Sequence, residues 1–249
     1  MDYKSGLGVT PIARRGGKSK LANKLINLFP EFKTYVEPFL GAGNVFLRIP
    51  EDELNNKKIV LNDLDKDIYT IFTGIKKRGK YINNNINRNQ ITKEEFKELK
   101  NKTDVISVIE RYKNSFFGQG KVFATTYPDQ IIKTNYEVIS HKLKNAIILN
   151  ESFETVIKAY DSQTTFFYLD PPYESIKKND YLNYVEPEDI YNSIKNIKGK
   201  FLLSYNDSSN IRKIFNKYFI YEIETSYSHT KYMNPRRIKE LIITNYDLE

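Results

Sequence analysis

The stretch YVEPFLGAGNVFLRI, residues 35–49, has the pattern of a β-strand that turns through glycines into a helix. Tyr35-Val36-Glu37 is a short extended run, and Gly41 and Gly43 permit a tight turn after it. The apolar run Lys58–Asn62 predicts a second strand, followed by a helix over residues 65–75. This strand–helix–strand–helix opening predicts a parallel sheet with helices on its faces.

The same alternation returns in the second half of the chain. We predict strands over residues 146–149, 165–169 and 201–205, and helices over residues 153–160, 187–197 and 208–218. A further helix is expected from Lys18 to Leu28, and two final apolar runs, 219–223 and 241–244, favour an antiparallel hairpin. The expected fold is α/β and Rossmann-like, with a mostly parallel sheet and a terminal antiparallel hairpin.

The middle of the chain has a different character. Residues 76–145 hold 15 lysines and arginines against 7 acidic residues, whereas the remainder holds 24 of each. Thr92-Lys93-Glu94-Glu95 has the spacing of a capping box, which predicts a helical insert. We therefore expect a catalytic domain over residues 1–75 and 146–249, and a smaller, mainly helical lobe over residues 76–145. The charge alone fits a polyanion-binding patch or a solvated, lysine-rich lobe.

Composition excludes several classes of protein. Hydrophobic residues make up 40% and charged residues 28% of the chain, which is typical of a soluble globular protein. We expect no membrane span or signal peptide, because no apolar run is long enough and the first residues lack an apolar core. With no cysteine and two histidines, neither a disulfide nor a metal site is expected.

Two loops at the ends of the first predicted strands favour a nucleoside-containing ligand. The turn from Glu37 to Gly43 lets a ligand approach the backbone. Asp63 follows the second strand, 20 residues after Gly43, a separation at which a carboxylate can accept ribose hydroxyls. The alternative is an ordinary strand-to-helix turn with Asp63 as a helix cap.

A third loop, Asp170-Pro171-Pro172-Tyr173, follows the apolar strand Thr165–Leu169. This loop has the groups needed to activate an aromatic amine, such as the amino group of a nucleobase. Such an amine is a poor nucleophile because its lone pair is delocalised into the ring. The Asp170 carboxylate and the Pro171 carbonyl can accept its two N–H groups, while Pro172 rigidifies the loop and Tyr173 stacks on the base. The alternative is a loop that only terminates the strand.

The order of these motifs resembles that of the Dam-like, alpha-group adenine-specific DNA methyltransferases. The resemblance spans nearly the whole chain. It rests on Gly16-Gly17-Lys18, Glu37–Gly43, Asp63, the basic insert, Asp170–Tyr173, and the closing segments Leu203–Asn206 and Glu240–Asn245.

The resemblance implies a site-specific enzyme that transfers a methyl group from S-adenosylmethionine to the exocyclic amino nitrogen of adenine in double-stranded DNA. It implies that Asp170, Pro171, Pro172 and Tyr173 form the catalytic loop, and that the following residues contact the cofactor: Arg14, Lys18, Phe39, Gly41, Gly43, Asp63 and Asp170. Arg14 departs from the family, which usually has an aromatic residue there. Phe153 is a further candidate for the cofactor adenine, with core packing as the alternative.

The resemblance also implies that the basic lobe recognises the target and that the adenine flips out of the duplex. Asn114, Phe116 and Phe117 are candidates for the wedge or for groove contacts. Arg236 and Arg237 either contact phosphates or are only solvated. The implied partners are double-stranded DNA and a restriction endonuclease, and the implied location is the cytoplasm or wherever the DNA lies.

Three alternatives remain open from the residues. In the first, the chain is a methyltransferase whose substrate is RNA adenine or a protein glutamine, although the glutamine enzymes carry asparagine where Asp170 stands. In the second, the chain is a non-catalytic DNA-binding module that has kept the fold of a methyltransferase but not its activity. A nicotinamide oxidoreductase fits least, because residues 37–43 lack the third glycine of the dinucleotide-binding motif.

Overall fold

The computed structural model describes residues 10–12, 17–125, 134–173, 185–227 and 236–248. The chain divides into two compact units. The first comprises residues 1–26, 40–55 and 65–150, and the second comprises residues 27–39, 56–64 and 151–249. The predicted domain boundary at residue 75 falls inside helix α2, Lys66–Asn85, three residues before a kink at Arg78, whose φ and ψ are not helical. The division into a catalytic domain and a lobe over residues 76–145 stays a prediction.

The second unit is built on a mixed β-sheet. Its strands are β1 (Thr34–Glu37), β2 (Lys58–Asn62), β4 (Thr165–Leu169), β5 (Lys200–Asn206), β6 (Phe219–Tyr227) and β7 (Arg236–Thr244). They lie in the order β2-β1-β4-β5-β7-β6. The pairs β2–β1, β1–β4 and β4–β5 are parallel, and β7 runs antiparallel to both β5 and β6. This confirms the predicted α/β fold with a terminal antiparallel hairpin.

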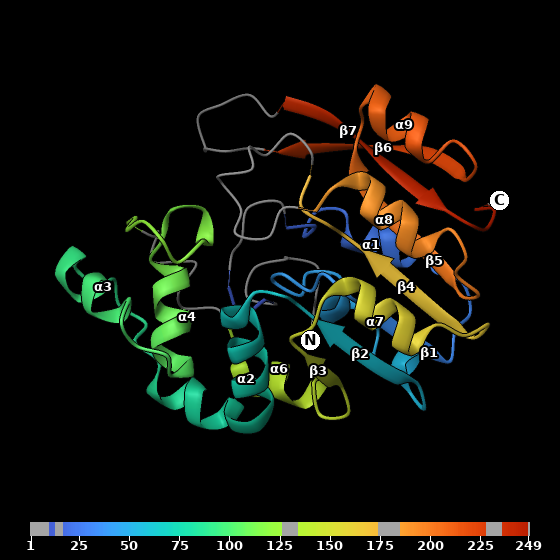
Figure 1. The fold of residues 1–249 in the computed structure, drawn as a ribbon. Helices are drawn as coiled ribbons and strands as arrows, with labels where there is room; N and C mark the ends of the chain where they lie inside the picture. The colour runs from blue at the N-terminus through green and yellow to red at the C-terminus, as the bar shows by residue number, and fades with distance from the viewer. Residues whose placement is uncertain (1–9, 13–16, 126–133, 174–184, 228–235, 249) are drawn as a thin grey trace. The chain divides into compact units, whose positions relative to one another are not determined.

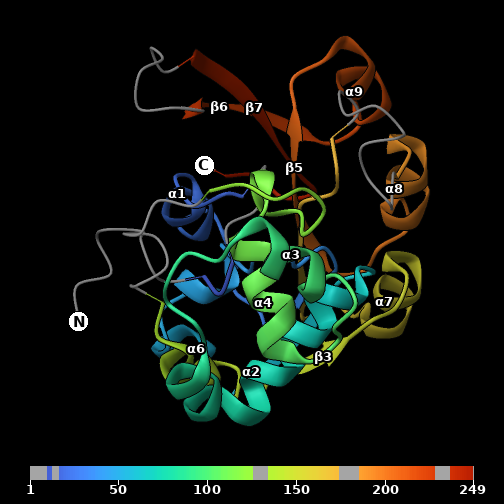
Figure 2. The ribbon, with the colours of Figure 1, turned by 90° about the vertical axis from the view of Figure 1, so that its left-hand side faces the viewer.

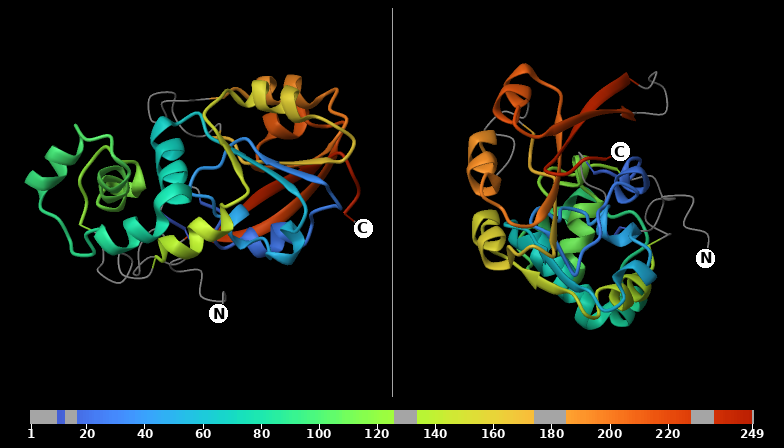
Figure 3. Two further views of the ribbon diagram at one scale, coloured as in Figure 1. Left: turned by 90° about the horizontal axis from the view of Figure 1, so that it is seen from below. Right: turned by 90° about the vertical axis from the view of Figure 1, so that its right-hand side faces the viewer.

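Strand β4 lies in the middle of the sheet and is buried along its whole length. All five of its residues are buried, as expected for a strand covered on both faces of a parallel sheet. The Phe166 ring lies 4.5 Å from that of Phe29 and 5.9 Å from that of Phe32, measured between ring centroids. Helices α7 (Phe153–Tyr160) and α8 (Pro187–Ile194) lie together on one face of the sheet (Figures 1 and 3). A third helix, α9 (Ser209–Ile214), follows β5.

The first unit is mainly helical. Its elements are α1 (Ala22–Ile26), the 3-10 turns η2 (Phe46–Arg48), η3 (Asp52–Leu54) and η4 (Phe116–Gly118), helices α2, α3 (Lys93–Leu99), α4 (Val105–Lys113) and α6 (Tyr136–Lys142), and β3 (Ile147–Leu149). Helix α2 packs against α4 and α6, and α3 packs against α4 (Figure 2). A Cβ atom at Gly79 would lie 2.4 Å from Ser140 Cβ. Only glycine at this position therefore allows α2 and α6 to approach so closely.

Several predicted helices differ in extent from those in the structure. The helices expected over residues 18–28, 187–197 and 208–218 are shorter, at Ala22–Ile26, Pro187–Ile194 and Ser209–Ile214. Residues 44–49, expected to be a helix, form only the 3-10 turn η2, because Pro50 has no N–H to continue a helix and Lys142 Nζ donates to the carbonyls of Leu47 and Ile49. Helix α2 continues ten residues beyond the predicted end at residue 75, to Asn85, across a kink at Arg78. Its buried face continues to Ile82, one heptad after Ile75, which explains the extension.

Candidate active site

The carboxyl ends of three parallel strands meet at one edge of the sheet in the second unit. The register pairs Glu37 at the end of β1 with Leu61 of β2, and Val36 with Phe167 of β4. The loops that begin after Glu37, Asn62 and Leu169 therefore leave the sheet side by side. Ligands of open α/β sheets bind at such an edge.

Asn62 holds two of these loops together. Its buried side chain donates from Nδ2 to the carbonyls of Pro38 and Glu151, both at 3.0 Å, and Oδ1 accepts from the Glu151 N–H at 2.9 Å. The amide thus uses both its donor and acceptor groups on backbone far away in sequence. These hydrogen bonds fix the positions of Phe39, which directly follows Pro38, and of Phe153, which lies two residues after Glu151.

Phe39 and Phe153 form an aromatic pair, as two of the residues predicted to contact a cofactor. Their ring centroids lie 5.2 Å apart with an interplanar angle of 33°. Phe153 is buried and Phe39 is half-buried, as is Asp63, which directly follows Asn62. The structure therefore brings two apolar rings and a carboxylate to neighbouring loops. This combination suits an adenosine, whose base is flat and apolar and whose ribose carries hydroxyls.

A buried hydrogen bond fixes the end of β1. The Tyr35 hydroxyl donates to Glu37 Oε2 at 2.8 Å, and both side chains are buried. Burial, followed by the nearby Glu37 carboxylate, raises the pKa of Tyr35 well above its usual range, so that the hydroxyl stays a donor. This contact stabilises the carboxylate where the strand passes into the turn.

Asp170 follows β4 and is oriented from β5. The Ser204 hydroxyl donates to Asp170 Oδ1 at 3.0 Å, and the hydroxyls of Ser204 and Tyr168 lie 3.4 Å apart. Ser204 is fully buried, whereas Asp170 is half-buried at the sheet edge. A buried side chain of the sheet thus orients the Asp170 carboxylate.

The rest of the loop Asp170–Tyr173 is supported by tyrosines and a glutamate. The Tyr205 hydroxyl donates to the Pro172 carbonyl at 3.4 Å, and the rings of Tyr173 and Tyr205 stack at 5.4 Å with an interplanar angle of 25°. The Tyr173 hydroxyl donates to Glu240 Oε2 at 3.2 Å. Pro171 is buried and Pro172 is half-buried. The four residues predicted to be catalytic therefore lie on one loop with side-chain support from β5 and β7.

The remaining predicted cofactor residues belong to the first unit. Gly41 and Gly43 have φ values of +51° and +69°, a region that favours glycine, and the Gly43 N–H donates to the Leu40 carbonyl at 2.8 Å. A Cβ at Gly41 would meet nothing within 4 Å, so the backbone there borders open space. Lys18 is buried just before α1. Arg14 lies outside the described residues.

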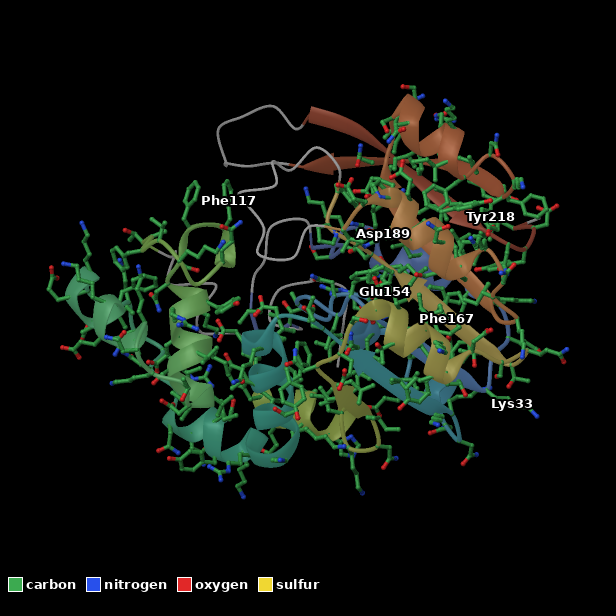
Figure 4. All side chains as sticks on the ribbon, viewed as in Figure 1. Lys33, Phe117, Glu154, Phe167, Asp189 and Tyr218 are labelled. Atoms are coloured by element: carbon green, nitrogen blue, oxygen red, sulfur yellow. The ribbon has the colours of Figure 1, made fainter. Side chains whose placement is uncertain are left out.

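The three predicted DNA contacts follow α4 but have different environments. Phe116 and Phe117 are 55% and 36% exposed, and their ring centroids lie 4.0 Å apart. The labelled Phe117 projects from the loop after α4, away from that helix (Figure 4). Asn114, by contrast, is buried, and its Nδ2 donates to the Glu110 carbonyl at 2.9 Å. The structure gives Asn114 a role in ending α4, and its contact with DNA stays a prediction.

The loop that carries Phe116 and Phe117, the aromatic loop, is held in place by its own hydrogen bonds. Phe116 N–H donates to the Val122 carbonyl at 2.7 Å, and Ser115 Oγ accepts from Gly120 N–H at 2.7 Å. Phe117 has a φ of +54°, which is strained for a residue other than glycine. Strain of this kind persists where surrounding contacts enforce it and is concentrated at functional sites.

The start of α2 anchors the helix that carries this loop. Arg111 donates to Asp67 Oδ2 at 2.6 Å, and the Tyr112 hydroxyl donates to Asp65 Oδ2 at 3.2 Å. Asp65 also caps α2 by accepting from the Asp67 N–H. Within the first unit, α4 is therefore fixed to the residues that directly follow the Asp63 loop in sequence.

Sequence reasoning missed the supporting residues of the site. Asn62, Ser204, Tyr205 and Glu240 did not appear among the predicted site residues, although each contacts a loop that did. The available signal was a polar side chain within or at the end of an apolar strand, as in FLLSYN and KELIIT.

Over the described ranges, no three His, Cys, Asp or Glu side chains are grouped so as to hold a metal ion. Within that same part of the chain, no helix has the length and apolar character to cross a membrane.

Comparison with known proteins identifies relatives over most of the chain. A family model described as D12 class N6 adenine-specific DNA methyltransferase matches residues 15–116 and 101–229. Type II methyltransferase M.CviBI of Paramecium bursaria Chlorella virus NC1A is 24% identical, over 85% of this chain and 88% of that protein. The DNA adenine methylase of Haemophilus influenzae is 25% identical, over 91% of this chain and 90% of its own length. Type II methyltransferase M.FokI of Planomicrobium okeanokoites is 23% identical, over 95% of this chain but 43% of that longer protein.

Proposed function

This chain belongs to the D12 class N6 adenine-specific DNA methyltransferases, and on that premise we propose that the loop Asp170–Tyr173 is its catalytic site. The reaction of the class is transfer of a methyl group from S-adenosylmethionine to the exocyclic amino nitrogen of adenine in DNA. The observation that carries the assignment is the Asp170 carboxylate, held by Ser204 at the carboxyl end of β4.

The residues at the sheet edge fit the adenosyl part of the methyl donor. Phe39 and Phe153 offer apolar rings for the adenine base, and Asp63 offers a carboxylate for the ribose hydroxyls. The open space beside Gly41 suits close approach of a ligand to the backbone. When bound, S-adenosylmethionine supplies an electrophilic methyl group on a sulfonium. We assign further contacts to Lys18, Gly43 and Arg14 from their places in the family motifs.

Asp170 and the Pro171 carbonyl accept the two N–H groups of the target amine. This arrangement keeps the nitrogen lone pair directed away from the acceptors and toward the incoming methyl group. Tyr173 stacks on the adenine, and the prolines hold the loop in one conformation. Positioning and electrostatic preorganisation lower the barrier without a covalent enzyme intermediate. The N–CH3 bond forms as the S–CH3 bond breaks to leave a neutral thioether, and the surplus proton on the nitrogen passes by way of the Asp170 carboxylate to water. A base inside a duplex cannot reach such a site, so the adenine must flip out of the stack.

We further propose that the helices of the first unit bind double-stranded DNA. Residues 76–145 contain the whole basic excess of the chain, which suits phosphate neutralisation. Phe116 and Phe117 form an exposed aromatic pair on a rigid loop, a feature suited to filling the gap left by a flipped base. Two of the relatives are Type II methyltransferases, which supports site-specific modification with a restriction endonuclease as partner. The place of action follows the DNA, in the cytoplasm of a host or a virus-infected cell.

The test is transfer of labelled methyl from S-adenosylmethionine to mixed-sequence double-stranded DNA, with the modified base identified by mass spectrometry. The unaltered protein is compared with Asp170→Ala and with Asp189→Ala, an exposed aspartate on α8 that is labelled in Figure 4. We expect N6-methyladenine from the unaltered protein and Asp189→Ala, and none from Asp170→Ala. Full activity of Asp170→Ala would contradict the proposed site, and labelling of RNA in preference to DNA would contradict the proposed substrate.

A further inference from the structure

Glu240 is a buried carboxylate in a strand that is otherwise apolar at this point. It is 1% exposed and precedes the buried residues Leu241, Ile242 and Ile243 of β7. The register places it opposite Asn206 of β5 and Ile223 of β6. Burying a carboxylate costs free energy unless hydrogen bonds compensate for the lost water. A glutamate at this position therefore calls for an explanation beyond packing.

The Glu240 carboxylate contacts the loop proposed to be catalytic. The Tyr173 hydroxyl donates to Glu240 Oε2 at 3.2 Å, across 67 residues of sequence. The same tyrosine stacks on Tyr205 at 5.4 Å, and Tyr205 in turn donates to the Pro172 carbonyl. Tyr173 is thus held by its hydroxyl from β7 and by one ring face from β5.

We propose that Glu240 is a positioning residue that fixes the Tyr173 ring in the plane needed to stack on the target adenine. The inference rests on the proposed function of the loop. Stacking on Tyr205 alone leaves a ring free to slide and rotate in its own plane, whereas a second anchor at the hydroxyl removes that freedom. Since Tyr205 covers one face of the ring, the base stacks on the opposite face.

This role explains why a tyrosine, and not a phenylalanine, ends the loop. A phenylalanine would keep the ring but would lack the hydroxyl that donates to Glu240 at 3.2 Å. Preorganisation of this kind acts on the step in which the amine meets the methyl donor. It leaves the binding of S-adenosylmethionine, assigned to Phe39, Asp63 and Phe153, unchanged.

The test compares Tyr173→Phe, Glu240→Ala, Glu240→Gln and the double variant Tyr173→Phe/Glu240→Ala, with Glu224→Gln, an exposed glutamate on β6, as the control. Tyr173→Phe removes one oxygen atom and keeps the ring. We measure the single-turnover rate of adenine methylation at saturating DNA, the dissociation constant of S-adenosylmethionine, and the melting temperature.

We expect Tyr173→Phe and Glu240→Ala each to slow methylation about 10-fold, which corresponds to the loss of one hydrogen bond. The double variant should be no slower than either single variant, and Glu240→Gln, whose amide oxygen can still accept, should recover part of the rate. Cofactor binding and melting temperature of Tyr173→Phe should match those of the control.

The positioning role would be overturned by a normal rate for Tyr173→Phe, or by losses that multiply in the double variant. A fall in cofactor affinity or melting temperature that parallels the rate in Tyr173→Phe would also overturn it. Failure of the proposed function is separate, because it appears as undiminished methylation by Asp170→Ala. An inactive Asp170→Ala together with a fully active Tyr173→Phe would reject only the role of Glu240.

Discussion

The Ser204 hydroxyl donates a hydrogen bond to Asp170 Oδ1 at 3.0 Å. Ser204 is fully buried in β5, and Asp170 begins the loop after β4, which is parallel to β5. The register that pairs Leu169 with Leu203 places Ser204 beside Asp170. The orientation of the carboxylate is therefore set by the sheet and not by the loop alone.

Ser204→Ala should slow methylation about 10-fold, because the Asp170 carboxylate loses the contact that selects its rotamer. Cofactor affinity should stay within about twofold, since Ser204 contacts none of the residues assigned to the cofactor's adenosyl part. Single-turnover rates and calorimetric titration with S-adenosylmethionine measure the two effects. Ser193→Ala, the same change at a half-buried position on α8 where the hydroxyl donates to the Asp189 carbonyl, is the control. An unchanged rate for Ser204→Ala would show that Asp170 needs no support from β5.

The strands that the sequence predicted well are those whose apolar runs have sharp polar ends. Lys58–Asn62 and Thr165–Leu169 have the predicted boundaries, because each run is buried along nearly its full length. The helix expected over residues 44–49 is wrong in type, since the contact of Lys142 with this turn joins residues more than 90 positions apart. Local periodicity carries no information about such a contact.

Replacement of the two turn glycines by alanine should separate folding from ligand binding. In Gly43→Ala, the new Cβ would lie 2.8 Å from the edge of the Phe72 ring at a φ of +69°. We expect a loss of about 2–4 kcal/mol in the free energy of unfolding, from backbone strain and overpacking together. Gly41→Ala adds strain at a φ of +51° but meets no atom within 4 Å, so its loss should be about 1 kcal/mol.

The same pair of variants tests the assignment of Gly41 to the cofactor. If a ligand fills the open space beside Gly41, the added methyl group should weaken S-adenosylmethionine binding at least about tenfold in a protein that remains folded. Urea unfolding and calorimetric titration give the two quantities. Normal cofactor affinity in Gly41→Ala would remove this glycine from the cofactor site.

The aromatic loop should show opposite effects on stability and on activity. Phe117→Gly relieves a positive φ, so the free energy of unfolding should rise by about 1 kcal/mol. DNA methylation should fall if the ring fills the gap left by the flipped base, and Phe116→Ala should lower methylation without changing stability. Asn114→Ala should instead destabilise the protein by about 1 kcal/mol, because Asn114 is buried and bonded to Glu110. Undiminished methylation by both phenylalanine variants would exclude a wedge at this loop.

The loop proposed to be catalytic could be singled out from the sequence because the groups it would use lie in four consecutive residues, Asp170–Tyr173. The residues that support it could not be, because Ser204, Glu240 and Asn62 acquire their roles from strand register. A serine in FLLSYN looks like an ordinary interruption of an apolar strand until β5 is placed beside β4. Glu240 likewise becomes informative only when the antiparallel pairing brings β7 to the edge where Tyr173 lies.

Lys142 should give the protein a measurable pH dependence of stability. Burial, as the largest effect, lowers the pKa of Lys142 to about 8 from its ordinary value of 10.5. Between these two pKa values the unfolded chain binds the proton and the folded chain does not, so the free energy of unfolding rises with pH. The slope from this one lysine is at most about 1.4 kcal/mol per pH unit, and below pH 8 the unfavourable contribution is fully present. The neutral amine still has N–H groups for the carbonyls of Leu47 and Ile49.

Urea midpoints measured from pH 7.5 to 9.5 should therefore climb more steeply for the unaltered protein than for Lys142→Met. Lys144→Met, an exposed lysine in the same segment, should keep the slope of the unaltered protein. Parallel slopes for all three proteins would show that Lys142 keeps an ordinary pKa in the folded state.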